Sequence, residues 1–508
     1  MASADTHRLV GLCAAFFCLF FAFFAAQNQV SSTLGKYGTY SLSLLYGSFA
    51  ISGIFAPAIL RLLQRIATAC CSSASSASSS SSADGGGGRL VAETFGLVLG
   101  SALYAPFLAA CSIVTLHWGQ LVGSALLGVG AGILWVSQGS LLNASCTEAN
   151  RGRWSGIFWA CFMSGNACGN FVTALLIRYV AGVSNSTVFL ILAAVAALSS
   201  VLFAVLVRAR PAGESPSALS VATAASDVGF LSSDHDDKTE SLLLIPVAAA
   251  VDEFESELHE SASTSEVTTP DSLLNDVREL LAVFVKPDVL VLLPVLLFIG
   301  AENSFWSGAY NGILGDAWGA EAVALVSGTL AVADILASIA AGSFLDKFGK
   351  TQQCGGWGSR LLLLTGLGAF VGALAIIVFC VRPAATAMSV SSSPPALAYV
   401  AGALMGCGDG IANTVITTRL GGLAEDALLL PRRTAFQFFQ IFNVMMTCAG
   451  FFYMAQWPLG SSLVQVYILL TLIAASALLF ALFARPVRSV AAVAAAAVVA
   501  AAGATVGP

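Results

Sequence analysis

The sequence predicts an all-α membrane protein with twelve transmembrane helices in two six-helix halves. Two observations lead to this prediction: twelve strongly apolar segments, and a long acidic loop with six of them on either side. Each segment approaches the ~20 residues that a helix needs to cross a hydrocarbon core of roughly 30 Å. Two related halves are typical of secondary transporters. The segments are residues 9–26, 41–63, 90–115, 119–142, 154–177, 187–207, 289–312, 322–344, 360–381, 396–418, 434–455 and 462–484.

Composition excludes an ordinary soluble protein. Of the 508 residues, 57% are hydrophobic and 10% are charged, and the mean hydropathy is +0.85; soluble domains carry about 25% charged residues. Residues 211–287 hold 15 acids and 3 bases, whereas the rest of the chain holds 13 acids and 19 bases. The net charge of −6 is therefore the sum of an acidic loop and a basic membrane-spanning remainder. We expect the lipid bilayer as its surroundings and no nucleic-acid partner.

The basic residues predict the orientation. With the N-terminus placed inside, 19 of the 22 Lys and Arg residues fall in cytoplasmic segments; Lys36, Arg178 and Arg382 are the exceptions. Because short cytoplasmic loops are enriched in Lys and Arg, we expect both termini in the cytosol. Segment 9–26 is long for a signal-peptide core and lacks a small-x-small cleavage site, so we expect it to be a helix. The host membrane is the plasma membrane or an endomembrane of the endosome or vacuole type.

The apolar segments divide the chain into regions. We expect an N-terminal six-helix bundle at 1–207 with a flexible Ser/Gly tether at 72–88, and an acidic, mostly disordered cytosolic loop at 208–287. A C-terminal six-helix bundle at 288–484 and an Ala/Val-rich tail at 485–508 complete the order.

Three short motifs are candidates for modification or sorting. Cys70 and Cys71 follow the second segment on the cytosolic side, a position suited to palmitoylation, although two unmodified cysteines are the simpler alternative. Asn185 begins an Asn-Ser-Thr glycosylation sequon on the expected outer side, in a short loop. An acidic-dileucine-like sorting signal, a short and common pattern, is formed by Glu240, Leu244 and Ile245.

Soluble-enzyme motifs are absent from the sequence, so we expect no enzyme, no cofactor and no metal site. Three acids instead lie near the middle of apolar segments: Glu302, Asp334 and Asp409. A charge inside a membrane costs several kcal/mol, and no Lys, Arg or His lies at comparable depth. Such an acid is protonated, hydrated in a cavity or neutralised by a cation, which makes each a candidate ion site. The alternative is a protonated acid that hydrogen-bonds a neighbouring helix.

Neutral polar residues extend the candidate midplane site. They are Asn303 and Asn413 beside the acids, and Gln27, Asn28 and Gln138 in the first half. Any one of them is more typical of an interhelical hydrogen bond, but the set indicates a polar central cavity. Glycines at 406, 408 and 410 surround Asp409; they either let a ligand approach the backbone or let two helices pack closely.

A glycine- and charge-rich motif ends the eighth segment. It consists of Gly342, Asp346, Lys347, Gly349 and Lys350. The motif resembles the Gly-x-x-x-Asp-x-x-Gly-Arg/Lys signature of the major facilitator superfamily. That resemblance implies a latch between two halves at the cytoplasmic face. The corresponding loop after the second segment, residues 61–71, lacks both the Asp and the glycines.

Several blocks together resemble the UNC-93-like ion-channel regulatory proteins, a branch of that superfamily. The blocks are FFAAQNQVSSTL at 23–34, LLYGSF at 44–49, FAP at 55–57, LWVSQG at 134–139, GIFWA at 156–160, GN at 169–170, GCGD at 406–409 and AF at 435–436. The resemblance implies a twelve-helix facilitator fold, and roles in potassium homeostasis, channel regulation or receptor trafficking.

Two functions follow from these observations. The first is a facilitator-type transporter, or transporter-like protein, in potassium or proton-coupled ion homeostasis, with an ion or small solute bound at Glu302 and Asp409. The second is a regulator or trafficking chaperone of a channel or receptor that does not itself transport. The acidic loop and the missing first-half latch favour the second.

Overall fold

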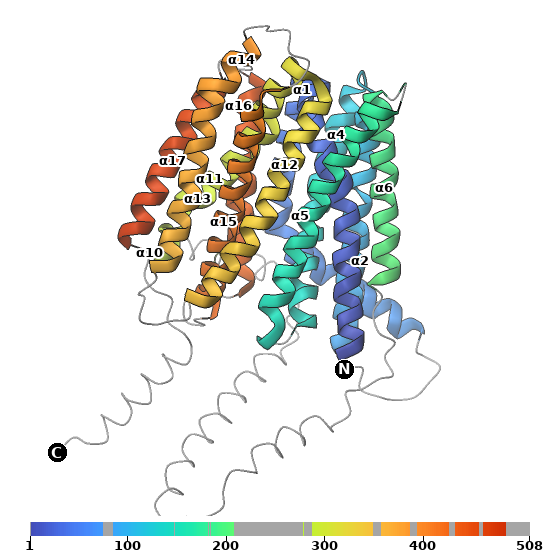
Figure 1. The fold of residues 1–508 in the computed structure, drawn as a ribbon. Coiled ribbons are helices and arrows are strands. Elements are labelled where there is room, and N and C mark those ends of the chain that lie inside the picture. Colours follow the sequence, from blue (N-terminus) through green and yellow to red (C-terminus); the bar gives the residue numbers. More distant parts are fainter. Residues whose placement is uncertain are drawn as a thin grey trace, which may run out of the picture. The chain divides into compact units, whose positions relative to one another are not determined.

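In the computed structural model of the chain, every regular element of the described residues is a helix (Figure 1). The structure describes residues 2–74, 85–146, 148–180, 182, 184–207, 278, 287–348, 357–386, 394–425, 432–456 and 461–483. The helices are α1 (Ala2–Ala74), α2 (Gly85–Ala102), α3 (Tyr104–Cys111), α4 (His117–Ser145), α5 (Glu148–Tyr179), α6 (Asn185–Leu206), α10 (Pro287–Leu290), α11 (Leu293–Ser304), η1 (Phe305–Tyr310), α12 (Asn311–Phe348), α13 (Trp357–Ile376), η3 (Ile377–Val381), α14 (Arg382–Thr386), α15 (Ala396–Glu425), α16 (Arg432–Gln456) and α17 (Ser461–Phe483).

Two long helices bend at glycines. The backbone of α1 leaves helical geometry at Gly35 (φ 57°, ψ −131°), and that of α12 does so at Gly319 (φ 83°, ψ 179°). Residues with a Cβ rarely adopt such angles, whereas glycine adopts them readily. Each glycine bend therefore joins two helical segments into one long element.

Eight segments within the described residues are long and apolar enough to cross a membrane, so the chain is an integral membrane protein. Two of them, Thr6–Phe55 and Leu293–Leu345, contain 50 and 53 residues, more than twice the ~20 that one crossing needs. These two contain the glycine bends. The expected segments 396–418 and 434–455 coincide with α15 and α16, which are not among the eight.

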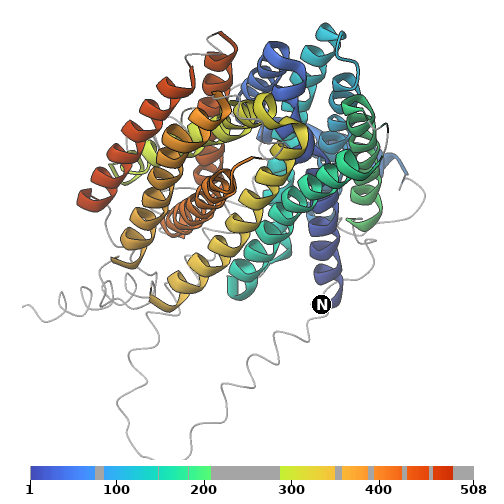
Figure 2. The same cartoon turned by 45° about the horizontal axis from the view of Figure 1, so that its top comes forward.

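The apolar side chains pack into two cores. One is built mainly from α1 to α6, where Phe16 packs against Trp135, Phe158 and Phe203 with ring centroids 5.6, 4.8 and 5.4 Å away. The other is built from α10 to η3, α15 and α17, whereas α16 contributes Val444, Phe451 and Met454 to the first. Along the seam between them, α5 lies beside α12 and α1 beside α16, as Figures 1 and 2 show. The candidate midplane residues lie on α1, α4, α11, α12 and α15.

Some expected boundaries are wrong. Segment 90–115 is interrupted at Leu103, between α2 and α3, because Pro106 cannot donate the backbone hydrogen bond that would continue the helix. Helix also covers both ends of the expected tether, since α1 runs to Ala74 and α2 begins at Gly85. Residues 75–84, most of the acidic loop and the tail lie outside the described residues, so their predictions remain predictions.

Candidate functional site

The structure brings the three midspan acids together. Glu302 lies on α11, Asp334 on α12 and Asp409 on α15, and the carboxyl groups lie within electrostatic range of one another. Glu302 is 1% exposed and Asp334 is 3% exposed, whereas Asp409 is only partly buried. Among the described residues, no Lys or Arg forms an ion pair with them. We call these three acids on three helices the carboxyl cluster; no three His, Cys, Asp or Glu side chains of the described residues lie close enough together to hold a metal ion.

The three acids of the carboxyl cluster differ in the hydrogen bonds that their carboxyl groups accept. Ser338 Oγ donates to Asp334 Oδ1 at 3.1 Å, and Asn413 Nδ2 donates to Asp409 Oδ1 at 2.5 Å. Each donor lies one turn further along the same helix. Glu302 Oε1 is buried without a hydrogen-bond partner in the described part of the chain. Since a buried acceptor without a donor is costly, Glu302 is the group that gains most from a bound proton or cation.

Glycine packing explains why the cluster forms. A Cβ at Gly410 would lie 2.5 Å from both the carbonyl oxygen and Oδ1 of Asp334, and a Cβ at Gly406 would clash with the carbonyl of Leu330. These glycines therefore let α15 pack directly on α12, as small residues four apart commonly do in membranes. Of the two explanations for the glycines, close helix packing is the one that this geometry fits.

An irregular turn follows Glu302. The π-helical η1 begins at Phe305, and Ser307 Oγ donates to the carbonyl of Asn303 at 2.5 Å. At its end, Tyr310 Oη donates to the carbonyl of Ala398 at 2.8 Å. Single π-helical turns are frequent at functional sites. This turn could not be predicted from the hydrophobic periodicity.

A tyrosine links the amides of the two cores. Tyr46 Oη, on α1, donates to Gln27 Oε1 at 2.8 Å and accepts from Asn303 Nδ2 at 3.5 Å. Gln27 and Asn303 were both expected at the midplane, but Tyr46 was missed because a tyrosine in an apolar run usually indicates packing. Asn303 is the neighbour of Glu302, so the tyrosine joins α1 to the backbone that carries the carboxyl cluster.

The remaining predicted amides lie apart from this link. Asn28 Nδ2 donates to Asn170 Oδ1 at 3.1 Å, and Asn170 Nδ2 donates to Asn166 Oδ1 at 2.8 Å. These bonds stay between α1 and α5. Gln138 is buried on α4, and none of the described hydrogen bonds connects it to the other candidates. The structure therefore divides the predicted cavity residues into smaller groups.

We expect Tyr46→Phe to destabilise the protein by about 1–3 kcal/mol, because it leaves a buried amide oxygen without its donor. Tyr40→Phe is the matched control: Tyr40 Oη accepts from Gln456 Nε2 at 3.0 Å at an exposed position, where water replaces the lost bond. Thermal unfolding of both purified variants measures the difference. Equal midpoints would contradict the role given to Tyr46.

Contacts between the helices before residue 208 and those after residue 287 gather at one end of the helices. The described hydrogen bonds between them include Gln29 Nε2 to the carbonyl of Ala320 at 3.0 Å and Ser43 Oγ to the carbonyl of Cys448 at 3.1 Å. An exposed ion pair joins Arg178 to Glu321 at 3.1 Å. Together with the Tyr40 and Tyr46 bonds, they lie between the glycine bends and the middle of the helices. The end that contains Gly35 and Gly319 is therefore the one at which these contacts hold the two parts of the chain together; we call it the closed end.

The other predicted residues have simpler positions. Gly342, Asp346 and Lys347 lie in the last two turns of α12, with Lys347 exposed, whereas Gly349 and Lys350 fall outside the described residues. Cys70 and Cys71 lie near the end of α1. Asn185 is exposed at the start of α6, and its Nδ2 donates to Thr33 Oγ1 at 3.3 Å. The sorting candidates Glu240, Leu244 and Ile245 lie outside the described residues.

One buried acid escaped the sequence reasoning. Glu93 lies in α2 and is 3% exposed, and Ser140 on α4 donates to its carboxyl. It stands near the start of the expected segment 90–115, where an acid is expected to reach the membrane surface, rather than near its middle. An acid near the end of an apolar segment can therefore be buried in the bundle as well as an acid near its middle.

Three comparisons place the chain among known proteins. A family model described as ion channel regulatory protein UNC-93 matches residues 89–484. The UNC93-like protein MFSD11 of Xenopus laevis is 24% identical over 466 residues, covering 88% of this chain and 89% of that protein.

Solved structures share the fold at low sequence identity. A POT family transporter bound to a thioalcohol-conjugated peptide has a TM-score of 0.57 at 13% identity, covering 93% of this chain and 96% of its own. A bacterial homologue of the human lysosomal transporter Spinster, in an inward-facing and unoccupied conformation, has a TM-score of 0.54 at 13% identity, covering 96% and 100%. The fold is that of membrane transporters.

Proposed function

The chain belongs to the UNC-93 family of ion channel regulatory proteins, and from this we propose that it is a facilitator-type transporter in ion homeostasis. It is a transporter-like membrane protein by family and fold. We propose that a potassium ion, a proton or a small cationic solute binds at the carboxyl cluster. Glu302 and Asp409 are the principal groups, and Asp334, Asn303 and Asn413 support them.

The observation that carries this proposal is the carboxyl cluster itself. Three acids lie within electrostatic range of one another in the interior; Asp334 accepts a hydrogen bond from Ser338 and Asp409 accepts one from Asn413, whereas Glu302 Oε1 has no partner in the described residues. Their mutual repulsion and desolvation disfavour three negative charges together. A bound cation or proton removes that cost. Partial exposure of Asp409 gives the ion an entry point.

We further propose twelve crossings in two halves, at 1–207 and 288–484, as in the major facilitator superfamily. The bends at Gly35 and Gly319 support this proposal because each divides one long helix into two crossings. Both termini then face the cytosol, which agrees with the distribution of Lys and Arg.

With this orientation, the closed end faces outward and the site is reached from the cytosol. The bonds of Gln29, Ser43 and Tyr46 to the second half support an outer seal. Alternating access then requires these bonds to break while the cytoplasmic ends close. The motif of Gly342, Asp346 and Lys347 stands at the end that would close. We propose the plasma membrane or an endomembrane of the endosome or vacuole type as the location of the protein.

Ion flux tests the proposal directly. Purified protein in proteoliposomes should carry a potassium or proton flux, and Asp409→Asn should reduce it about tenfold or more, the equivalent of at least 1.4 kcal/mol in the barrier. Asp316→Asn is the matched control, because Asp316 lies on α12 at an exposed position. Undiminished flux in Asp409→Asn would overturn the site.

The second candidate function is a regulator of a channel or receptor. The observation that favours it is the acidic region 211–287 beside a first half without a latch motif. If the unaltered protein carries no flux in proteoliposomes, and deletion of residues 211–272 changes association with a channel or receptor in cells, this function replaces transport.

A further inference from the structure

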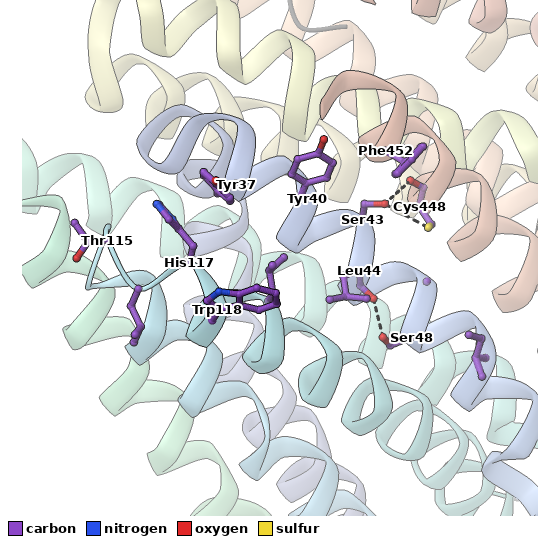
Figure 3. Close-up of a pocket in the computed structure, with 14 residues that line it drawn as sticks. Tyr37, Tyr40, Ser43, Leu44, Ser48, Thr115, His117, Trp118, Cys448 and Phe452 are labelled. Carbon is purple, nitrogen blue, oxygen red and sulfur yellow. Dashed lines mark hydrogen bonds between the residues drawn. The ribbon is translucent and has the colours of Figure 1, made fainter. Parts of the chain in front are cut away.

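A groove of about 770 Å³ opens between α1, the start of α4 and α16 (Figure 3). Its long wall is apolar and includes Leu44, Ile51 and Phe452, which are 40%, 62% and 52% exposed. Large apolar side chains at such exposure in a membrane protein face acyl chains. The groove therefore lies on the surface that meets the bilayer, away from the carboxyl cluster.

One end of the groove is polar, and a lysine lies beside it. Tyr37 and His117 stack there with ring centroids 3.8 Å apart, and Figure 3 shows their rings side by side. Lys36 Nζ lies 5.5 Å from the centre of the ring of Tyr40, which lines the groove. His117 Nδ1 has no hydrogen-bond partner in the described part of the chain. None of the lining residues is acidic, so this end suits an anion.

The distance between the two ends fits a lipid. Tyr37 and Ile51 are separated by 14 residues of α1, about 21 Å at 1.5 Å per residue. That length accommodates a headgroup and much of an acyl chain. An apolar partner helix would not pair with a charge at one end of the groove. A phospholipid, in contrast, presents a phosphate followed by an acyl chain.

We propose that the groove binds one phospholipid, with its phosphate at Lys36 and His117 and an acyl chain along Leu44, Ile51 and Phe452. Because α1 lies before the acidic loop and α16 after it, the lipid bridges the two parts of the chain beside the Ser43–Cys448 hydrogen bond. Bound lipid thus stabilises the closed end. The site is separate from the carboxyl cluster, so it stands whether or not the protein transports ions.

Lipid counting on the full-length protein tests the apolar wall. The purified protein is titrated with phosphatidylglycerol, and bound lipids are counted by native mass spectrometry. One lipid should bind tightly to the unaltered protein. Ser48→Trp, which fills the groove with an indole ring, should weaken that binding at least tenfold. Leu198→Trp on α6 is the matched control, because Leu198 is 52% exposed outside the groove, and it should bind as the unaltered protein does.

A second variant tests the polar end without changing the wall. Lys36→Gln combined with His117→Gln removes the positive rim and should weaken binding about tenfold, the equivalent of 1.4 kcal/mol, as expected for one charged hydrogen bond. Unchanged binding in both Ser48→Trp and the rim variant would overturn the proposal. The proposal would also be wrong if a second copy of the chain or another helix occupied the groove in place of lipid.

Discussion

Glu302→Gln is expected to reduce potassium or proton flux at least tenfold while leaving the thermal stability unchanged or raised. Glutamine keeps the shape of the side chain but can carry neither a negative charge nor an exchangeable acidic proton. Since Glu302 Oε1 has no hydrogen-bond partner in the described residues, the substitution breaks no bond made by that oxygen. It removes a charge that is expensive inside a membrane.

This combination separates a transport role from a structural one. A purely structural acid, held by hydrogen bonds to a neighbouring helix, would lose stability when replaced, because breaking one side of a buried pair leaves the other unsatisfied. A binding group loses flux and keeps its fold. Flux in proteoliposomes and thermal unfolding of the same preparation measure both quantities.

Glu321→Gln supplies the matched control. Glu321 pairs with Arg178 at 3.1 Å at the exposed end of the helices, and exposed ion pairs contribute about 0–1 kcal/mol. We expect the control to change both flux and stability little. Full flux in Glu302→Gln would remove Glu302 from the site, and joint loss of flux and folding would assign it a structural role.

Much of the fold was predictable because hydropathy reports directly on burial in lipid. The helical class and most apolar segments follow from it. Hydropathy does not predict where a helix ends, because hydrogen bonding determines the helix ends. The segment 9–26 was expected to end before Gln27, yet the helix continues to Gly35, since the amides of Gln27, Asn28 and Gln29 find partners inside the protein.

The candidate site was predictable in composition but not in arrangement. Acids stand out in apolar segments, so Glu302, Asp334 and Asp409 could be named from the sequence. Their meeting depends on the distance between α12 and α15, which hydropathy does not report. Tyr46 could not be distinguished from other aromatic residues, because its function lies in one hydroxyl group at the end of an apolar ring.

Gly410→Ala is expected to destabilise the protein by about 1–3 kcal/mol, the usual cost of overpacking a close contact. The added Cβ would lie 2.5 Å from the carbonyl oxygen and Oδ1 of Asp334 and 2.7 Å from Ser338 Oγ. One of these atoms belongs to the backbone and cannot rotate away. The helices α12 and α15 must therefore separate.

Separation of these helices should also affect transport. Asp334 and Asp409 lie on the two helices that separate, so the proposed ion site would lose its geometry, and flux should fall together with stability. Gly368→Ala is the matched control, because a Cβ there meets no heavy atom within 4 Å; substitutions at such positions usually change stability by less than about 0.5 kcal/mol. Equal unfolding midpoints for the two variants would show that α15 does not pack closely on α12. The carboxyl cluster would then lose the contact that assembles it.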